Sequence, residues 1–219
     1  MKITNILVNH MHEPVGFDLS HLLVEFSIES SDANIEKRLI ISTNDVVVYE
    51  TEFEAYDNNK FSPDFVLEPR TKYNVAVEIK ANGEVVSEST FFETGKLNES
   101  WTAEWIAHPE KNLQNTIFKK EIDLKGSVKN ARLYMTGLGV YETYLNGEKI
   151  SDEILAPGTT DYGKWIQIQT YDVTDALQLG KTSWTVSTAD GWYKGVFGFI
   201  EGLDKHYGDH HRIIAELHI

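Results

Sequence analysis

The chain has 219 residues, no cysteine and a formal net charge of −14. This charge argues against nucleic acid or an anionic membrane surface as a partner, because both need clustered Lys and Arg. The missing cysteine excludes disulfides, thiolate nucleophiles and Cys-based zinc sites. Hydrophobic residues make up 41% of the chain, which is enough for one large folded domain or two small ones.

The amino-terminal sequence, residues 1–10, contains no long apolar stretch, so we predict no signal peptide. No apolar run reaches the roughly 20 residues needed to cross a bilayer. Together with the lack of cysteine, this favours a cytoplasmic location. A secreted location stays open, since secreted bacterial proteins can also lack cysteine.

The first part of the chain reads as a series of short strands separated by turn residues. An Asn-Gly pair at 82 and 83 lies between two of them, and this pair is typical of a β-hairpin because both positions need positive φ. Strands at roughly 8–12-residue spacing indicate a sandwich. The predicted strands cover residues 3–8, 22–28, 38–42, 45–51, 75–79 and 84–92.

The segment 67–75, Leu-Glu-Pro-Arg-Thr-Lys-Tyr-Asn-Val, resembles the tyrosine-corner segment of fibronectin type III domains. In such a corner the tyrosine hydroxyl bonds to backbone upstream. We therefore predict a structural role for Tyr73. The ending Phe91-Phe-Glu-Thr-Gly95 also resembles the last strand of that fold, so residues 1–96 are predicted to form a fibronectin type III-like sandwich.

Residues 96–104 are polar and predict the lead-in to a second domain, 97–219. An Asn146-Gly147 hairpin, a short helical turn in 172–180 and long loops after Ile150 and Ala189 indicate a jelly-roll sandwich. The chain stops inside a predicted strand, so we expect it to be truncated at its carboxyl end. The predicted strands cover residues 116–124, 131–136, 140–145, 148–150, 165–171, 184–188 and 212–219.

Several motifs of the second domain are similar to those of one enzyme family. These are Arg132-Leu-Tyr-Met-Thr-Gly-Leu-Gly-Val-Tyr-Glu-Thr-Tyr-Leu-Asn-Gly-Glu-Lys-Ile150, Ala156-Pro-Gly-Thr-Thr-Asp-Tyr162, Tyr171-Asp-Val-Thr-Asp175 and Asp190-Gly-Trp-Tyr-Lys-Gly195. With the lead-in Trp101-Thr-Ala-Glu-Trp-Ile106, they resemble the amino-terminal β-sandwich of bacterial α-L-rhamnosidases. The resemblance covers essentially the whole chain.

The resemblance implies a function for the longer protein. Full-length members are inverting glycoside hydrolases that release terminal α-L-rhamnose, and their catalytic carboxylates lie on a downstream (α/α)₆ barrel. It therefore implies no catalytic residue in this fragment, which we expect to be inactive alone, whereas the full-length protein would be an enzyme. In some members a sandwich of this kind binds rhamnose with calcium, so calcium is a possible ligand although no cofactor is required.

Aromatic rings beside short acids are what a sugar-binding surface needs, and the loop after Ala189 offers them. Trp192 and Tyr193 are candidates for stacking on a sugar ring, the alternative being packing between the sheets. Asp190 is a candidate for binding sugar hydroxyls or a cation, the alternative being a turn acid before Gly191. Asp161 is the next candidate. We disfavour paired-carboxylate hydrolysis by the two acids.

A calcium site of Asp, Asn and carbonyl oxygens is compatible with these loops, but the chain has no Asp-x-Asp-x-Asp-Gly loop and no metal can be assigned. His206, His210 and His211 lie near one another in sequence. We interpret them as a solvated loop rather than as metal ligands.

The leading hypothesis is a non-catalytic amino-terminal fragment that supports an absent catalytic barrel and binds rhamnose-containing carbohydrate. One rival is a free-standing carbohydrate-binding module. A second is a purely structural interaction domain, and a third is a fragment that hydrolyses glycosides itself.

Overall fold

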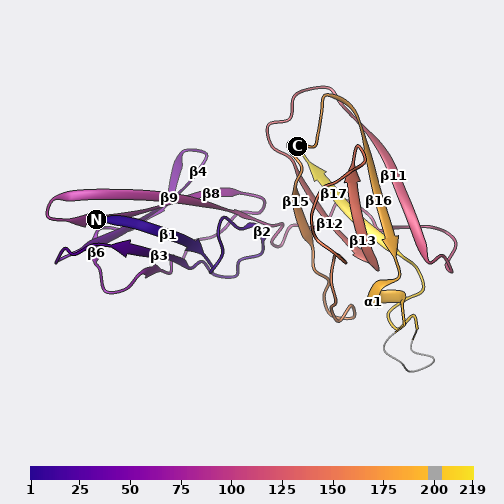
Figure 1. The fold of residues 1–219 in the computed structure, drawn as a ribbon, viewed down its shortest axis with the longest axis horizontal. Helices are drawn as coiled ribbons and strands as arrows, with labels where there is room; N and C mark the ends of the chain where they lie inside the picture. Colours follow the sequence, from indigo (N-terminus) through magenta and orange to yellow (C-terminus); the bar gives the residue numbers. More distant parts are fainter. Residues whose placement is uncertain (197–203) are drawn as a thin grey trace. The chain divides into compact units, whose positions relative to one another are not determined.

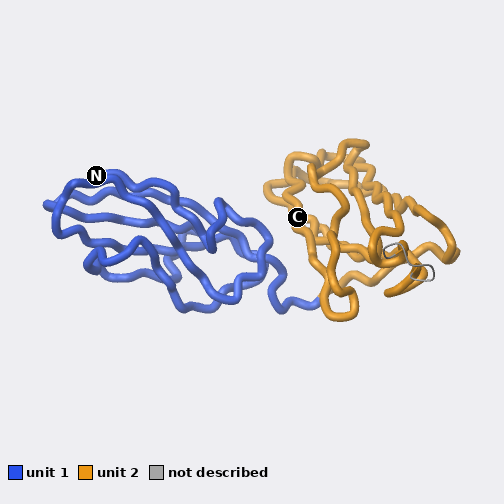
Figure 2. Tube along the Cα trace, turned by 60° about the horizontal axis from the view of Figure 1, so that its bottom comes forward, with its two compact units in different colours: residues 1–100 blue, residues 101–219 orange. Residues whose placement is uncertain are grey.

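The computed structural model describes residues 1–196 and 204–219, and consists mainly of β-strands and their connections (Figure 1). Its contacts divide the chain into two compact units, Met1–Ser100 and Trp101–Ile219 (Figure 2). The sequence predicts this division between residues 96 and 97. Each unit contains two sheets that pack around a core, so the predicted all-β architecture of two consecutive sandwiches is confirmed.

The first unit contains a three-stranded sheet, β1-β3-β7, and a six-stranded sheet in which β2-β9-β8-β4-β5 form the main path and β6 pairs with β4. Alternation along β8 sends Tyr73, Val75, Val77 and Ile79 into the core. The strands are β1 (Lys2–Val8), β2 (Val15–Phe17), β3 (Val24–Glu29), β4 (Glu36–Thr43), β5 (Val46–Glu50), β6 (Glu54–Ala55), β7 (Lys60–Phe61), β8 (Lys72–Ala81) and β9 (Glu84–Thr94).

The predicted tyrosine corner is present in the first unit. The Tyr73 hydroxyl accepts a hydrogen bond of 2.8 Å from the backbone N–H of Glu68, five residues upstream. Its ring is buried and stacks on Phe92 at a centroid distance of 4.9 Å. The bond thus ties the segment that enters β8 to the aromatic core.

Replacing Tyr73 with phenylalanine is expected to destabilise the first unit by about 1 kcal/mol, because the Glu68 amide loses its acceptor while the ring packing stays. Hydrogen exchange of the Glu68 amide measures the effect locally. Tyr49→Phe is the matched control, because the rings of Tyr49 and Tyr73 both pack against Phe65. An unchanged Glu68 exchange rate in Tyr73→Phe would contradict the corner.

The second unit contains two four-stranded sheets, β10-β17-β12-β15 and β11-β16-β13-β14. The predicted hairpin is confirmed: Asn146 and Gly147 have φ values of 52° and 87° between β13 and β14. The elements are β10 (Ile106–Ala107), β11 (Asn115–Leu124), β12 (Arg132–Leu138), β13 (Val140–Leu145), β14 (Glu148–Lys149), β15 (Gln169–Asp172), β16 (Gly180–Ala189), α1 (Gly191–Lys194) and β17 (Arg212–His218).

Two local predictions for the second unit differ from the structure. Residues 165–168 alternate in sequence but lie outside β15, which begins at Gln169. Strand pairing ends there. In its place, the Thr136 hydroxyl donates a hydrogen bond of 2.7 Å to the Gln167 carbonyl. The predicted long loop after Ala189 contains the one-turn helix α1, which was not predicted from the sequence. No helix in the described ranges is long and apolar enough to span a membrane.

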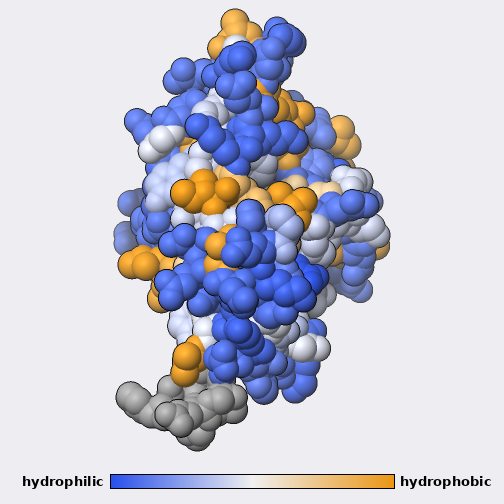
Figure 3. Space-filling view, turned by 90° about the vertical axis from the view of Figure 1, so that its right-hand side faces the viewer, coloured by the Kyte–Doolittle hydropathy of each residue, from blue (hydrophilic) through white to orange (hydrophobic). Residues whose placement is uncertain are grey.

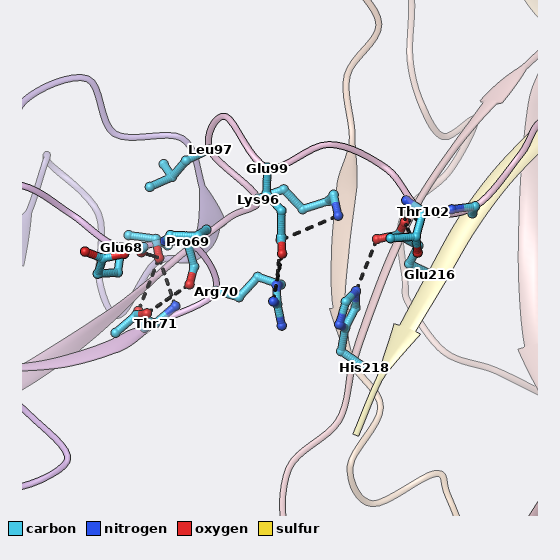
Figure 4. A network of polar contacts seen from close by, with 12 residues as sticks. Glu68, Pro69, Arg70, Thr71, Lys96, Leu97, Glu99, Thr102, Glu216 and His218 are labelled. Carbon is cyan, nitrogen blue, oxygen red and sulfur yellow. Dashed lines mark hydrogen bonds and ion pairs between the residues drawn. The ribbon is translucent and has the colours of Figure 1, made fainter.

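A buried carboxylate fixes the start of the second unit. Glu216 on β17 accepts hydrogen bonds from the backbone N–H groups of Thr102 and Ala103 and from the Thr102 hydroxyl (Figure 4). Its other oxygen lies 3.1 Å from Nε2 of His218. Glu216 therefore holds the segment that leads into β10 against the outer face of its sheet.

Candidate functional site: a loop cluster at one end of the second sandwich

Three connections meet at one end of the second sandwich, namely those between β10 and β11, between β12 and β13, and between β16 and β17. Asn115 at the start of β11 and Val140 at the start of β13 both pair with Ala189 at the end of β16. Leu138 at the end of β12 pairs with Arg212 at the start of β17. The antiparallel register thus brings α1 beside the segments that precede β11 and β17, as the lower end of this unit shows in Figure 1.

Asp190 is the centre of a buried polar group at this end. Its Oδ1 lies 2.6 Å from Nε2 of His211 and 3.0 Å from Nζ of Lys194. The Lys194 ammonium also donates to the carbonyl of Leu113, and its side chain is only 4% exposed. These contacts join the segments that precede β11 and β17 to the helix α1.

Burial and hydrogen bonding set the charges of this group. Burial lowers the pKa of His211, and the nearby Lys194 charge lowers it further, against the opposing effect of Asp190. Partial burial raises the pKa of Asp190, but the hydrogen bonds from Lys194 and His211 outweigh it, so this pKa lies below its usual value. His211 is therefore a neutral imidazole whose Nε2–H donates to an Asp190 carboxylate.

The stability of the second unit should consequently fall as the pH falls below about 6.5. A histidine with a lowered folded-state pKa contributes full stability above its unfolded pKa and loses it as the unfolded chain takes up the proton. Asp190 adds a loss at still lower pH, through its own lowered folded-state pKa. Denaturant unfolding at pH 7 and pH 5 measures the change. Fluorescence reports this unit alone, because all five tryptophans lie within it.

The variant His211→Gln keeps an N–H that can reach Asp190 but cannot titrate. Its unfolding midpoint is expected to change less between the two pH values than that of the unaltered chain. His108→Gln is the control, since His108 lies in an exposed part of the same unit. Equal pH dependence in the unaltered chain and His211→Gln would contradict the neutral buried imidazole.

Three tyrosines join a further loop to this end. Tyr162 meets Tyr193 edge-on at 5.3 Å, and its ring lies 5.2 Å from that of Tyr207. Tyr193 and Tyr207 stack at 6.4 Å between centroids. The loop that contains Asp161 and Tyr162 therefore packs against α1 and against the segment before β17.

Two glycines permit this close packing. Gly191 has a φ of 54°, and a Cβ atom there would lie 2.6 Å from Cγ1 of Val140. A Cβ atom on Gly208 would clash with the Tyr193 ring. Side chains at either position would push α1 or the tyrosines apart, so the glycines are needed for the shape of the cluster.

The predicted site residues come to this end in different settings. Asp190 is held by His211 and Lys194, and Tyr193 belongs to the tyrosine group. Trp192 is half-buried on the same helix. Asp161 accepts a hydrogen bond of 3.1 Å from the backbone N–H of Gly163 and forms an ion pair of 3.2 Å with the exposed Lys164.

The interpretation of the three histidines as a solvated loop is wrong for His211, which is buried against Asp190. His210 pairs with Asp209, and only His206 is exposed. The sequence reasoning also missed Lys194. Its spacing of four residues from Asp190 would have been a signal, had a helical turn been expected there.

Calcium binding by these loops stays a prediction. Residues 1–196 and 204–219 contain no group of three His, Cys, Asp or Glu side chains placed to hold a metal ion. The two candidate carboxylates, Asp161 and Asp190, are each paired with a lysine.

Comparison with known proteins finds relatives of this chain. Residues 126–219 match the family model described as "Alpha-L-rhamnosidase N-terminal domain". An α-L-rhamnosidase of Formosa agariphila is 40% identical over 122 residues, which is 50% of this chain and 13% of that protein. One from Streptomyces avermitilis is 42% identical over 92 residues, 42% of this chain and 9% of that protein. The chain thus spans a small part of these relatives.

Solved structures extend the likeness of the fold to both units. The α-L-rhamnosidase of Dictyoglumus thermophilum matches with a TM-score of 0.84 at 23% identity, over 99% of this chain and 27% of that one. The S. avermitilis α-L-rhamnosidase complexed with L-rhamnose matches with a TM-score of 0.78 at 17% identity, over 99% and 39%. The chain therefore shares its fold with part of these α-L-rhamnosidases, and residues 126–219 match the N-terminal domain of the family.

Proposed function

We propose that this chain is the non-catalytic amino-terminal part of an α-L-rhamnosidase, in which the two sandwiches support a separate catalytic domain. The match of residues 126–219 to the family's N-terminal domain carries this proposal. The small share of each curated relative that the chain spans supports it further, because most of their length lies outside the similarity.

The chemistry of the loop cluster argues against Asp190 as the proton donor of a glycosidase. A glycosidase acid must hold a proton at working pH, which requires a raised pKa. The pKa of Asp190 is instead lowered, because its hydrogen bonds from Lys194 and His211 outweigh the effect of burial. Asp190 is thus an ionised anchor for the loops.

We further propose that the loop cluster contacts rhamnose-containing carbohydrate. Trp192 keeps exposed surface on α1 and can stack on the apolar face of a sugar. The Asp190 side chain is 36% exposed, so one of its carboxylate oxygens can still accept a hydrogen bond from a sugar hydroxyl. Tyr193 and Asp161 shape the neighbouring surface. The S. avermitilis structure with L-rhamnose makes L-rhamnose the sugar to test.

Calorimetric titration of the 219-residue chain with L-rhamnose, with and without calcium, tests this contact. Saturable binding that weakens at least several-fold in Trp192→Ala is the expected result, since stacking on a half-buried aromatic ring is worth about 1 kcal/mol or more. The proposed contacts do not involve calcium, so we expect the same affinity for L-rhamnose with and without calcium.

Trp105→Ala is the matched control, because Trp105 is an exposed tryptophan of the same unit outside the loop cluster. Equal loss in both variants would place the sugar elsewhere. If a folded chain gives no heat of binding, the purely structural interaction domain is favoured over both hypotheses that include sugar binding. Strong binding by the isolated chain would favour a free-standing carbohydrate-binding module.

A further inference from the structure

The second unit has an apolar groove along one open side of its sandwich. The groove has a volume of about 350 Å³ and lies where β10 and β17 of one sheet face β11 and β16 of the other. None of its lining residues belongs to the loop cluster. Its apolar walls are formed by Ile106, Phe118, Trp184, Val186, Ile213 and Ala215.

The strand registers explain why the groove is open. Phe118 pairs with Val186 and Lys120 with Trp184 across β11 and β16, which builds one wall. The pair of Ile106 with Ile213 contributes to the other. Since β10 is only two residues long, it covers little of this side, and Ile106 remains 50% exposed. The face seen from the right of Figure 1 is mainly hydrophilic, with apolar groups exposed across its middle (Figure 3).

Trp184 gives the groove a fixed aromatic wall. Its indole Nε1–H donates to the Thr143 hydroxyl at 2.8 Å, toward the interior of the sandwich. The polar atom of the ring is thereby satisfied within the protein, and the ring packs against the buried cluster of this unit. Stacking on Trp184 therefore leaves its hydrogen bond intact.

The rim of the groove carries a local positive charge. Lys119 and Lys120 line it together with Glu104, which leaves one positive charge in excess. Within residues 1–196 and 204–219, neither lysine takes part in an ion pair. The net charge of −14 is spread over the whole chain, and exposed charges beyond about 8 Å are screened at physiological salt. The lining of the groove thus carries one net positive charge although the whole chain is negative.

We propose that this groove binds a small aromatic anion, with its ring against Trp184 and Phe118 and its acidic group beside Lys120. The volume falls within the range of about 300–1,000 Å³ typical of small-molecule sites, at the lower end, which fits one or two rings. The lining offers too few polar groups for a sugar. This inference does not depend on the proposed function.

Anilinonaphthalene sulfonate is the probe, because it combines fused rings with a fixed negative charge. We expect saturable one-to-one binding that shifts the NMR signal of the Trp184 indole N–H, assigned with Trp184→Phe. The other four tryptophan indoles serve as internal references. An uncharged anilinonaphthalene should bind about fivefold more weakly, because it lacks the contact with Lys120.

Two variants on exposed positions test the site with little risk to folding. Lys120→Gln should weaken binding about fivefold, and Ile106→Gln several-fold, because it puts a polar group on the groove wall. Lys125→Gln is the matched control, since this lysine is exposed beyond the groove and pairs with Asp123. Unshifted Trp184 signal, or equal affinity in Lys120→Gln and Lys125→Gln, would overturn the proposal. A dimer that Ile106→Gln dissociates would assign the groove to a second copy instead.

Discussion

Replacing Lys194 with methionine should lower the free energy of unfolding of the second unit by about 3 kcal/mol. This value lies at the low end for breaking a buried ion pair, because Asp190 is partly exposed. The substitution leaves the Asp190 carboxylate with His211 alone and removes the donor to the Leu113 carbonyl. Denaturant unfolding followed by tryptophan fluorescence measures the loss.

The control for this variant is Lys164→Met. Lys164 also pairs with an aspartate within one turn, Asp161, but its side chain is 79% exposed. Exposed pairs of this kind contribute about 0–1 kcal/mol, so the control should be close to neutral. If both variants cost the same, Lys194 does not hold the loop cluster together.

Replacing Glu216 with alanine should destabilise the second unit by about 2–3 kcal/mol. Its carboxylate accepts hydrogen bonds from the backbone N–H groups of Thr102 and Ala103 and from the Thr102 hydroxyl. Hydrogen bonds to an ionised group are worth about 1.5–3 kcal/mol. The loss should appear in tryptophan fluorescence unfolding and as faster hydrogen exchange of the Thr102 and Ala103 amides.

Glu216→Gln removes the negative charge of the side chain but keeps its size, so it measures the contribution of the charge to stability. The amide keeps one oxygen that can accept from the same N–H groups, so we expect about half of the alanine effect. Glu121→Ala, on the exposed face of β11, should change stability by less than about 0.5 kcal/mol. Unchanged exchange of the Thr102 and Ala103 amides in Glu216→Ala would show that other contacts fix this segment.

Local signals in the sequence predicted much of the fold. The two Asn-Gly turns and the Tyr73 corner depend on residues close in the chain, and all three are confirmed. The prediction of a strand over 165–171 is wrong for residues 165–168, because alternation says nothing about whether a partner strand is present. There, the Thr136 side chain replaces the pairing.

The loop cluster was harder to predict because its contacts join distant parts of the chain. His211 lies 21 residues from Asp190, and the Leu113 carbonyl lies 81 residues from Lys194. The sequence singled out Asp190, Trp192 and Tyr193 on one loop. It gave no sign that Asp190 would be the anchor of a buried group, since that depends on which strand ends share one end of the sandwich.

We propose that this chain supports α-L-rhamnoside hydrolysis in a longer protein without performing it. The most direct measurement is release of the leaving group from an aryl α-L-rhamnoside by the folded 219-residue chain. We predict no release above the uncatalysed rate. Steady turnover that is lost in Asp161→Asn, a variant that leaves the Asp190 group untouched, would contradict the account and place a catalytic site within this chain.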